Sequence, residues 1–155
     1  IISQSAKTAL VLDPWYVPFE LVEAKSAGHT HLNISTAEPE SLLSWYGSNL
    51  GGERCGCEWD DAKSALQFDT LQLVIGNIQS QDQNRAWGPL DHIGWLTEDL
   101  DRSYEQMTAN DVKFTVKPRE FGAVRLAFAV DPCGILFELV EPPGGDIGLI
   151  KRGGR

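Results

Sequence analysis

Apolar residues recur along the chain in short runs, and two stretches show them at helical spacing. The first stretch runs from Pro39 to Leu50, and its apolar side chains fall on one helical face. Proline suits a first helical turn, and Gly51 follows as a C-terminal stop. The second stretch runs from about Leu100 to Asn110, with Asp99 as the expected N-cap. The pattern therefore predicts two amphipathic helices.

Strands are predicted before and after each helix, where apolar runs are bounded by turn residues. In the first half of the chain they cover residues 31–35, 52–58, 65–68 and 71–76. In the second half they cover residues 92–96, 113–116, 124–130 and 135–140. The order strand, helix, strand, strand, strand thus occurs twice, which indicates a duplicated α+β unit.

An eleven-residue segment also occurs twice. Residues 13–23 read DPWYVPFELVE and residues 131–141 read DPCGILFELVE, identical at seven positions without a gap. Asp-Pro opens a turn and the apolar run predicts a strand, so each copy is the tail of a hairpin. The first copy closes a unit whose beginning is missing, which suggests that a longer protein has lost its start. The predicted organisation is a closing hairpin (1–24), a first unit (27–78), a polar linker (79–90), a second unit (91–142) and a tail (143–155).

Composition narrows the class of protein. The net charge is -9 and the basic residues are scattered, which argues against nucleic acid as a partner. No stretch approaches the roughly 20 apolar residues that a membrane span needs. Cys55, Cys57 and Cys133 cannot form a full disulfide set and lack a second pair for a zinc site. Plain thiols in a reducing, cytoplasmic compartment are the expectation.

Strand alternation gathers the candidate chemistry on one face of each unit. His31 begins a strand in the first unit, and His92 begins the equivalent strand in the second. Glu138 is a charge inside an apolar run, which is costly unless a partner meets it. Two His and one carboxylate with open positions suit ferrous iron, and also manganese, nickel or zinc. Gln72 is aligned with Glu138 and is expected as a weak fourth ligand or a supporting group.

Several residues have competing interpretations. A lone His at a strand start is usually structural, but the repeat weakens that interpretation for His31 and His92. His29 has no counterpart in the second copy. Glu20 aligns with Glu138, yet its own unit lacks a strand with a His, so a solvated edge carboxylate is expected. Asn33 and Arg125 are candidate contacts for substrate oxygens, from strand-face reasoning alone.

The motifs resemble those of the vicinal oxygen chelate superfamily, which includes glyoxalase I, bleomycin-resistance proteins and extradiol dioxygenases. The resemblance covers about residues 29–142 and is carried by the segments THLNIS, DHIGWL, DVKF and DPCGILFELVE. It implies two paired βαβββ units in a cupped eight-stranded mixed sheet, preceded here by an extra N-terminal hairpin. It also implies a metal in the cup, chelated by two neighbouring substrate oxygens, with His31, His92 and Glu138 as ligands.

The chain departs from the family pattern at two points. Gln72 offers no base, which leaves Glu138 as the catalytic carboxylate and favours a dioxygenase-like ligand set over glyoxalase I. No His follows Lys117, although extradiol dioxygenases usually place further His residues around the substrate. In addition, Tyr16 stands where the family usually has Gly.

Three hypotheses follow for function. The first is an enzyme, a lyase, isomerase or dioxygenase, whose metal stabilises an enolate or activates dioxygen. The second is a metal-free small-molecule binding protein, in which the -9 charge favours cationic ligands and Trp45, Trp87 or Trp95 stacks on them. The third is a partial gene product that folds without activity. The units can pair within one chain or between the two chains of a homodimer.

Overall fold

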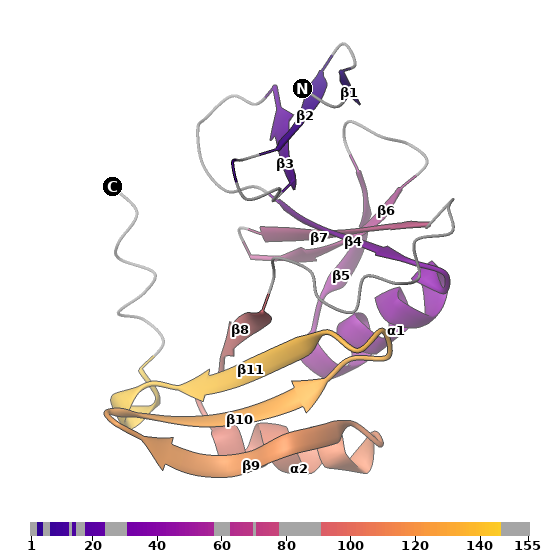
Figure 1. Cartoon of the computed structure of the whole chain (residues 1–155). Coiled ribbons are helices and arrows are strands. Elements are labelled where there is room, and N and C mark those ends of the chain that lie inside the picture. The colour runs from indigo at the N-terminus through magenta and orange to yellow at the C-terminus, as the bar shows by residue number, and fades with distance from the viewer. Residues whose placement is uncertain are drawn as a thin grey trace. The chain divides into compact units, whose positions relative to one another are not determined.

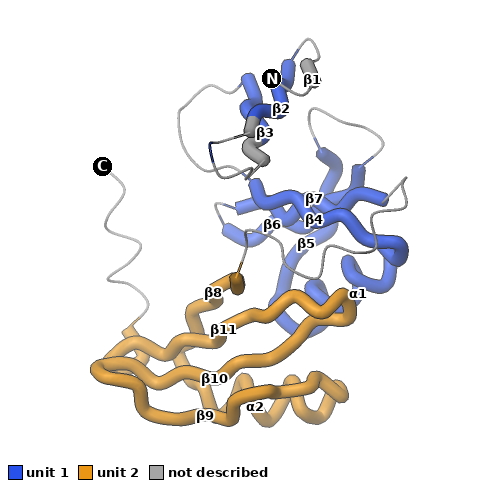
Figure 2. Tube along the Cα trace, viewed as in Figure 1, with its two compact units in different colours: residues 1–89 blue, residues 90–155 orange. Residues whose placement is uncertain are grey.

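The computed structural model describes residues 3–4, 7–12, 14, 18–23, 31–57, 63–69, 71–77 and 91–146. The chain divides into two compact units, residues 1–89 and 90–155 (Figure 2). The predicted linker, residues 79–90, lies outside the described residues, and so does the predicted tail beyond residue 146.

Unit 1 contains one complete βαβββ motif. Strand β4 (His31–Thr36) leads into helix α1 (Pro39–Leu50), which is followed by β5 (Glu53–Gly56), β6 (Ser64–Phe68) and β7 (Leu71–Asn77) (Figure 1). The strand order is β4-β7-β6-β5, with β4 and β7 parallel and the other pairs antiparallel. Helix α1 ends as predicted, because Gly51 adopts a left-handed backbone and its N–H donates to the carbonyl of Gly47.

Unit 2 repeats the motif. Strand β8 (His92–Leu96) leads into helix α2 (Leu100–Ala109), then β9 (Lys113–Phe121), β10 (Val124–Val130), β11 (Leu136–Glu141) and a short 3₁₀ turn, η1 (Pro143–Gly145). The order β8-β11-β10-β9 has the same topology as the sheet of unit 1. Leu100 and Met107 of α2 are buried together with Phe137 and Leu139 of β11. The predicted α+β class with two βαβββ units is confirmed.

Strand β9 is longer than the sequence predicted. It runs to Phe121 and passes through Pro118, whereas the expected strand ended at residue 116. Strand β9 lies at the sheet edge, where the missing N–H of a proline leaves no ladder bond broken. The register also shifts between Leu126 and Phe128 of β10, which accommodates an extra residue on the β9 side.

The N-terminal segment forms a small sheet of its own, β1 (Ser3–Gln4), β2 (Thr8–Leu12) and β3 (Pro18–Val22). Strands β2 and β3 form the predicted hairpin, and its register copies that of β10 and β11. Leu10 pairs with Glu20 as Phe128 pairs with Glu138. The sequence repeat is therefore a structural repeat, while its origin in a preceding unit stays a prediction.

The repeated Asp-Pro turn has a clear physical basis in unit 2. The carboxylate of Asp131 accepts hydrogen bonds from the backbone N–H of Cys133 and of Ile135, each at 2.8 Å. Gly134 takes the left-handed backbone that this turn requires, with a φ of 83°. These contacts set where β11 begins and thus the position of Glu138.

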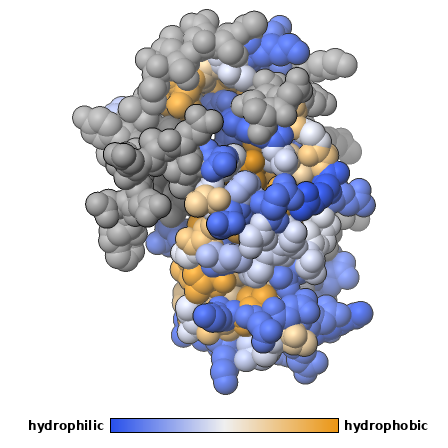
Figure 3. Space-filling view, turned by 90° about the vertical axis from the view of Figure 1, so that its right-hand side faces the viewer, coloured by the Kyte–Doolittle hydropathy of each residue, from blue (hydrophilic) through white to orange (hydrophobic). Residues whose placement is uncertain are grey.

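The surface view in Figure 3 shows mostly hydrophilic side chains, with hydrophobic ones in smaller groups between them. Among the described residues the exposed large apolar side chains are Leu21, Leu96 and Phe121. Within the described part of the chain, neither helix is long and apolar enough to cross a membrane.

Candidate functional site

The sheet of unit 2 has one face covered by α2, and His92 lies on the other. Pairing places Glu138 of β11 beside Gly94 of β8 and opposite Phe128 of β10. Side chains of paired residues point to the same side of a sheet, and residues two apart on one strand share a face. His92, Glu138 and Phe128 therefore share the open face, as the sequence predicted for the first two.

His92 stands between two carboxylates. Its Nδ1 lies 2.7 Å from Oδ2 of Asp91, and its Nε2 lies 3.6 Å from Oε2 of Glu138. The first distance is a strong hydrogen bond, and the second is too long for one. The Phe128 ring meets the imidazole edge-on, with ring centroids 5.5 Å apart. One ring nitrogen of His92 is thus anchored, and the other faces a carboxylate without being bonded to it.

In unit 1 the equivalent face carries His31, Asn33 and Gln72. His31 pairs with Gln72, and Asn33 pairs with Val74. The predicted match of Gln72 with Glu138 is wrong by two positions. Gln72 pairs with His31, but the residue that pairs with His92 is Leu136, and Glu138 follows two residues later. Val74 is the structural counterpart of Glu138. Gln72 nevertheless lies on the predicted face, directly beside His31.

The Gln72 side chain contains a polar atom of particular interest. Its Oε1 is buried and has no hydrogen-bond partner among the residues that the structure describes. Its Nε2 makes a weak contact of 3.7 Å with Sγ of Cys55. A buried acceptor without a hydrogen-bond partner costs free energy, so a bound ligand or cation that contacts this oxygen would be stabilised.

Glu20 is the site residue that sequence reasoning missed. Its Oε2 lies 3.0 Å from Nε2 of His31 and accepts a hydrogen bond of 2.7 Å from Nδ2 of Asn33. Nζ of Lys63 lies 3.8 Å from its Oε1. Its side chain is only 13% exposed, so the expected solvated carboxylate is wrong. The repeat that aligns Glu20 with Glu138 was the available signal.

Each of the two site histidines therefore has one ring nitrogen beside a carboxylate, Glu20 for His31 and Asp91 for His92. Metal-bound histidines usually show this arrangement, because the second partner fixes the tautomer and the ring orientation. Within either unit, the described residues contain no group of three His, Cys, Asp or Glu side chains that could hold a metal. The ligand set predicted from sequence draws on both units.

Comparison with known proteins supports the fold and the family. The model of the Glyoxalase/Bleomycin resistance protein/Dioxygenase superfamily matches residues 28–139, most of the chain. The chain belongs to this superfamily. The resemblance seen in the sequence is thereby confirmed. No curated protein matches the chain.

Several solved structures share the fold of this chain. A superfamily member from Sphaerobacter thermophilus is 24% identical, with 76% of this chain and 98% of that chain covered at a TM-score of 0.62. A superfamily enzyme from Burkholderia phytofirmans is 13% identical, with coverage of 74% and 98% and a TM-score of 0.62. TioX from Micromonospora is 12% identical, with coverage of 74% and 98% and a TM-score of 0.59. At such identities the likeness concerns the fold alone.

Arg125 does not lie on the open face of the sheet of unit 2, where the alternation of side chains along the strand was expected to place it. Arg125 pairs with Glu141, one residue out of phase with Val140 and Glu138, so it points to the helix side. Apart from Arg125, β10 is apolar, so its sequence has no alternation of polar and apolar residues that could have fixed which face each residue takes. The expectation that Arg125 shares the face of Glu138 is therefore wrong.

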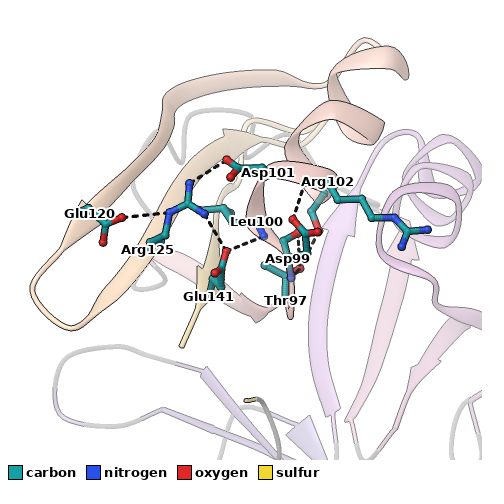
Figure 4. A network of polar contacts seen from close by, with 9 residues as sticks. Thr97, Asp99, Leu100, Asp101, Arg102, Glu120, Arg125 and Glu141 are labelled. Carbon is teal, nitrogen blue, oxygen red and sulfur yellow. Dashed lines mark hydrogen bonds and ion pairs between the residues drawn. The ribbon is translucent and has the colours of Figure 1, made fainter. Parts of the chain in front are cut away.

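The helix side of unit 2 instead holds a network centred on Arg125 (Figure 4). Its guanidinium contacts Asp101 at 2.9 Å, Glu120 at 3.3 Å and Glu141 at 3.2 Å. Glu141 also accepts the backbone N–H of Leu100 at 2.9 Å. The hydrogen bond from Arg125 holds the pKa of Asp101 below its usual value. This network fastens the start of α2 to β10 and β11.

The structure describes two of the predicted tryptophans. Trp45 packs edge-on against Tyr46 within α1, and Trp95 lies on the helix side of β8. Trp87 and His29 lie outside the described residues. Among the described residues the three cysteines form no disulfide, and burial raises the pKa of Cys55, with a further rise from the neighbouring Cys57.

Proposed function

We propose that the chain is a metal-dependent enzyme of the glyoxalase/dioxygenase type that acts on a small substrate with two neighbouring oxygen atoms. His31, His92 and Glu138 would hold a divalent cation such as Fe, Mn, Ni or Zn, and Gln72 would be a weaker fourth ligand. Superfamily membership supports the class. The proposal draws on ligands from both units.

The observation that carries the proposal is the setting of His92. Asp91 accepts from Nδ1 at 2.7 Å, which keeps the proton there and leaves the lone pair of a neutral ring on Nε2. That nitrogen faces Glu138 at 3.6 Å. An imidazole nitrogen and a carboxylate oxygen held side by side, and not bonded to each other, are two donors suited to one cation.

The donor chemistry elsewhere also fits a cation. The buried Oε1 of Gln72 is an acceptor without a hydrogen-bond partner in the described residues, on the same face as His31. Gly94 beside Glu138 carries no side chain, and an added Cβ would lie 4.0 Å from Oε2 of Glu138. A divalent cation would give the Gln72 oxygen the partner that the described residues do not provide.

The cation, when bound, supplies a Lewis acid that orients and polarises the substrate oxygens. The chain's own residues do the rest. Asp91 fixes the His92 ring, and Phe128 gives the face an apolar wall beside it. The Asn33 amide donates to Glu20, so its carbonyl oxygen is left to accept from a substrate hydroxyl. Glu138 is the carboxylate that could also take a substrate proton, since Gln72 cannot.

A second candidate function is metal-free binding of a small molecule, as in bleomycin-resistance proteins. The aromatic Phe128 beside His92 and the net charge of -9 favour it, because an aromatic face in an acidic protein attracts cationic ligands. In that case Glu138 pairs with the ligand's charge.

The test is the metal content of the full chain after supplementation with each cation, measured by elemental analysis. Replacing Glu138→Ala should abolish bound metal, while Glu105→Ala on the exposed side of α2 should not change it. Added cation should also raise the Tm of the wild type and not that of Glu138→Ala. Full metal retention by Glu138→Ala would overturn the assignment of Glu138 as a ligand. A wild type that neither holds metal nor gains stability from it would favour the binding protein.

A further inference from the structure

Glu20 lies outside residues 28–139, the part of the chain that matches the superfamily, yet it touches two site residues. We propose that Glu20 is a positioning residue that fixes the ring of His31 and the amide of Asn33 for ligand binding. The N-terminal hairpin would then be an integral part of the site and not a remnant. For its metal readout the inference rests on the function proposed above.

The geometry of one oxygen atom decides what Glu20 can do. Its Oε2 receives the Nδ2–H of Asn33 at 2.7 Å and lies 3.0 Å from Nε2 of His31. An ionised carboxylate only accepts hydrogen bonds, so His31 must donate from Nε2. A neutral His31 then carries its lone pair on Nδ1. Glu20 thereby selects the tautomer of His31, as Asp91 does for His92.

The contact between Glu20 and His31 is largely buried. The side chain of Glu20 is 13% exposed and that of His31 is 6% exposed. A carboxylate removed from water is costly unless donors and positive charge compensate it. His31, Asn33 and Lys63 provide that compensation. Charge-assisted hydrogen bonds of this kind are shorter and stronger than neutral ones, so they hold both partners in one orientation.

The hairpin explains why a carboxylate occurs at this place. Glu20 pairs across the hairpin with Leu10 as Glu138 pairs with Phe128, so both occupy the same position in copies of one motif. The last strand of unit 1 has the apolar Val74 at that position. The hairpin therefore brings to His31 a carboxylate that β7 does not provide.

The test compares the full-length wild type with Glu20→Ala, Glu20→Gln and the matched control Glu23→Gln. Glu23 is exposed at the end of the same hairpin. One readout is ¹⁵N NMR of the imidazole nitrogens without metal, with His31 assigned through His31→Gln. The other is affinity for Zn²⁺ by competition with a chromophoric chelator.

Wild type and Glu23→Gln should show the Nε2–H form of His31. Glu20→Ala should shift it toward the other tautomer and weaken Zn²⁺ binding about 10- to 100-fold, the usual effect of losing a partner of a ligating His. Glu20→Gln keeps an acceptor oxygen, so it should show a smaller loss. It also keeps the side-chain volume, so it remains informative if Glu20→Ala does not fold.

The outcomes separate the two proposals. Wild type that binds Zn²⁺ while both Glu20 variants bind equally well would overturn the positioning role and leave the metal site standing. Wild type that binds no divalent cation would remove the proposed metal function. In that case an unchanged His31 tautomer in both Glu20 variants would overturn the positioning role, and a shifted tautomer would support it.

Discussion

The two site histidines occupy equivalent strand positions but are held in different ways. The partner of His92 is its chain neighbour Asp91, whose side chain is 90% exposed. The partner of His31 is Glu20, which comes from another sheet and is 13% exposed. His92 is correspondingly open at 36% exposure, against 6% for His31. Duplication therefore conserved the position of the histidine and not its environment.

This difference extends to the neighbouring strand. His31 pairs with a polar residue, Gln72, whereas His92 pairs with Leu136 and has its carboxylate two residues further along. The same motif thus offers an amide beside one histidine and a carboxylate near the other. The two copies of the motif therefore differ in the chemistry beside the histidine.

The largest expected effect among the remaining tests concerns the exposed partner of His92. Asp91→Asn keeps an acceptor oxygen, and because the side chain is exposed, water can accept the hydrogen bond from His92 if the asparagine does not. It should weaken Zn²⁺ binding by less than about tenfold, the lower end for a partner of a metal-bound His. Chelator competition measures it, with Glu98→Gln as an exposed control in the same unit.

This result would sharpen the comparison between the two histidines. If Asp91→Asn weakens binding as much as Glu20→Ala, burial does not set the importance of the partner. The distinction drawn between His31 and His92 would then fail.

A second test compares the helices that follow the two histidine strands. In α2 the Asp99 side chain accepts the backbone N–H of Arg102 at 2.9 Å. Among described residues the N-cap of α1, Glu38, makes no capping bond through its side chain. Asp99→Ala should therefore lower the free energy of unfolding by about 1 kcal/mol, and Glu38→Ala by about zero. Urea unfolding measures both, and equal losses would show that the cap does not distinguish the units.

The sequence predicted local structure well where one element carries its own signals. Helix α1 has the predicted bounds because Pro39 and Gly51 mark both of its ends. The Asp-Pro turn and the N-cap Asp99 were found for the same reason. Each of these features depends on residues only a few positions apart in the chain.

Features that depend on pairing were predicted less well. Arg125 was given the wrong face because every other residue of β10 is apolar, so only the register with β11 fixes the phase. Gln72 was matched to Glu138 because the segments LQLV and FELV are similar, but the register between β7 and β4 determines which residue lies beside Gln72. Glu20 was missed because its contact with His31 joins two sheets. These relations are tertiary, and no local pattern encodes them.

The smallest expected effect is the acid response of the Arg125 network in unit 2. The hydrogen bond from Arg125 lowers the pKa of Asp101 in the folded chain. A lowered folded pKa means that the contact stabilises the fold above the unfolded pKa of about 3.9, and that this stabilisation is lost as pH falls through the folded value. Asp101→Asn should therefore have a slightly lower Tm than wild type at pH 7 and the same Tm near pH 2.

The control for this test is Asp111→Asn, which removes the same charge from an exposed turn whose left-handed backbone tolerates asparagine. Asp101 is 62% exposed, so high salt should shrink its difference from wild type. Melting curves from pH 7 to pH 2 at two salt concentrations measure both effects. A Tm difference that persists at pH 2 would mean that Asp101 stabilises unit 2 through its shape and not its charge, and the Arg125 network would then be a packing feature.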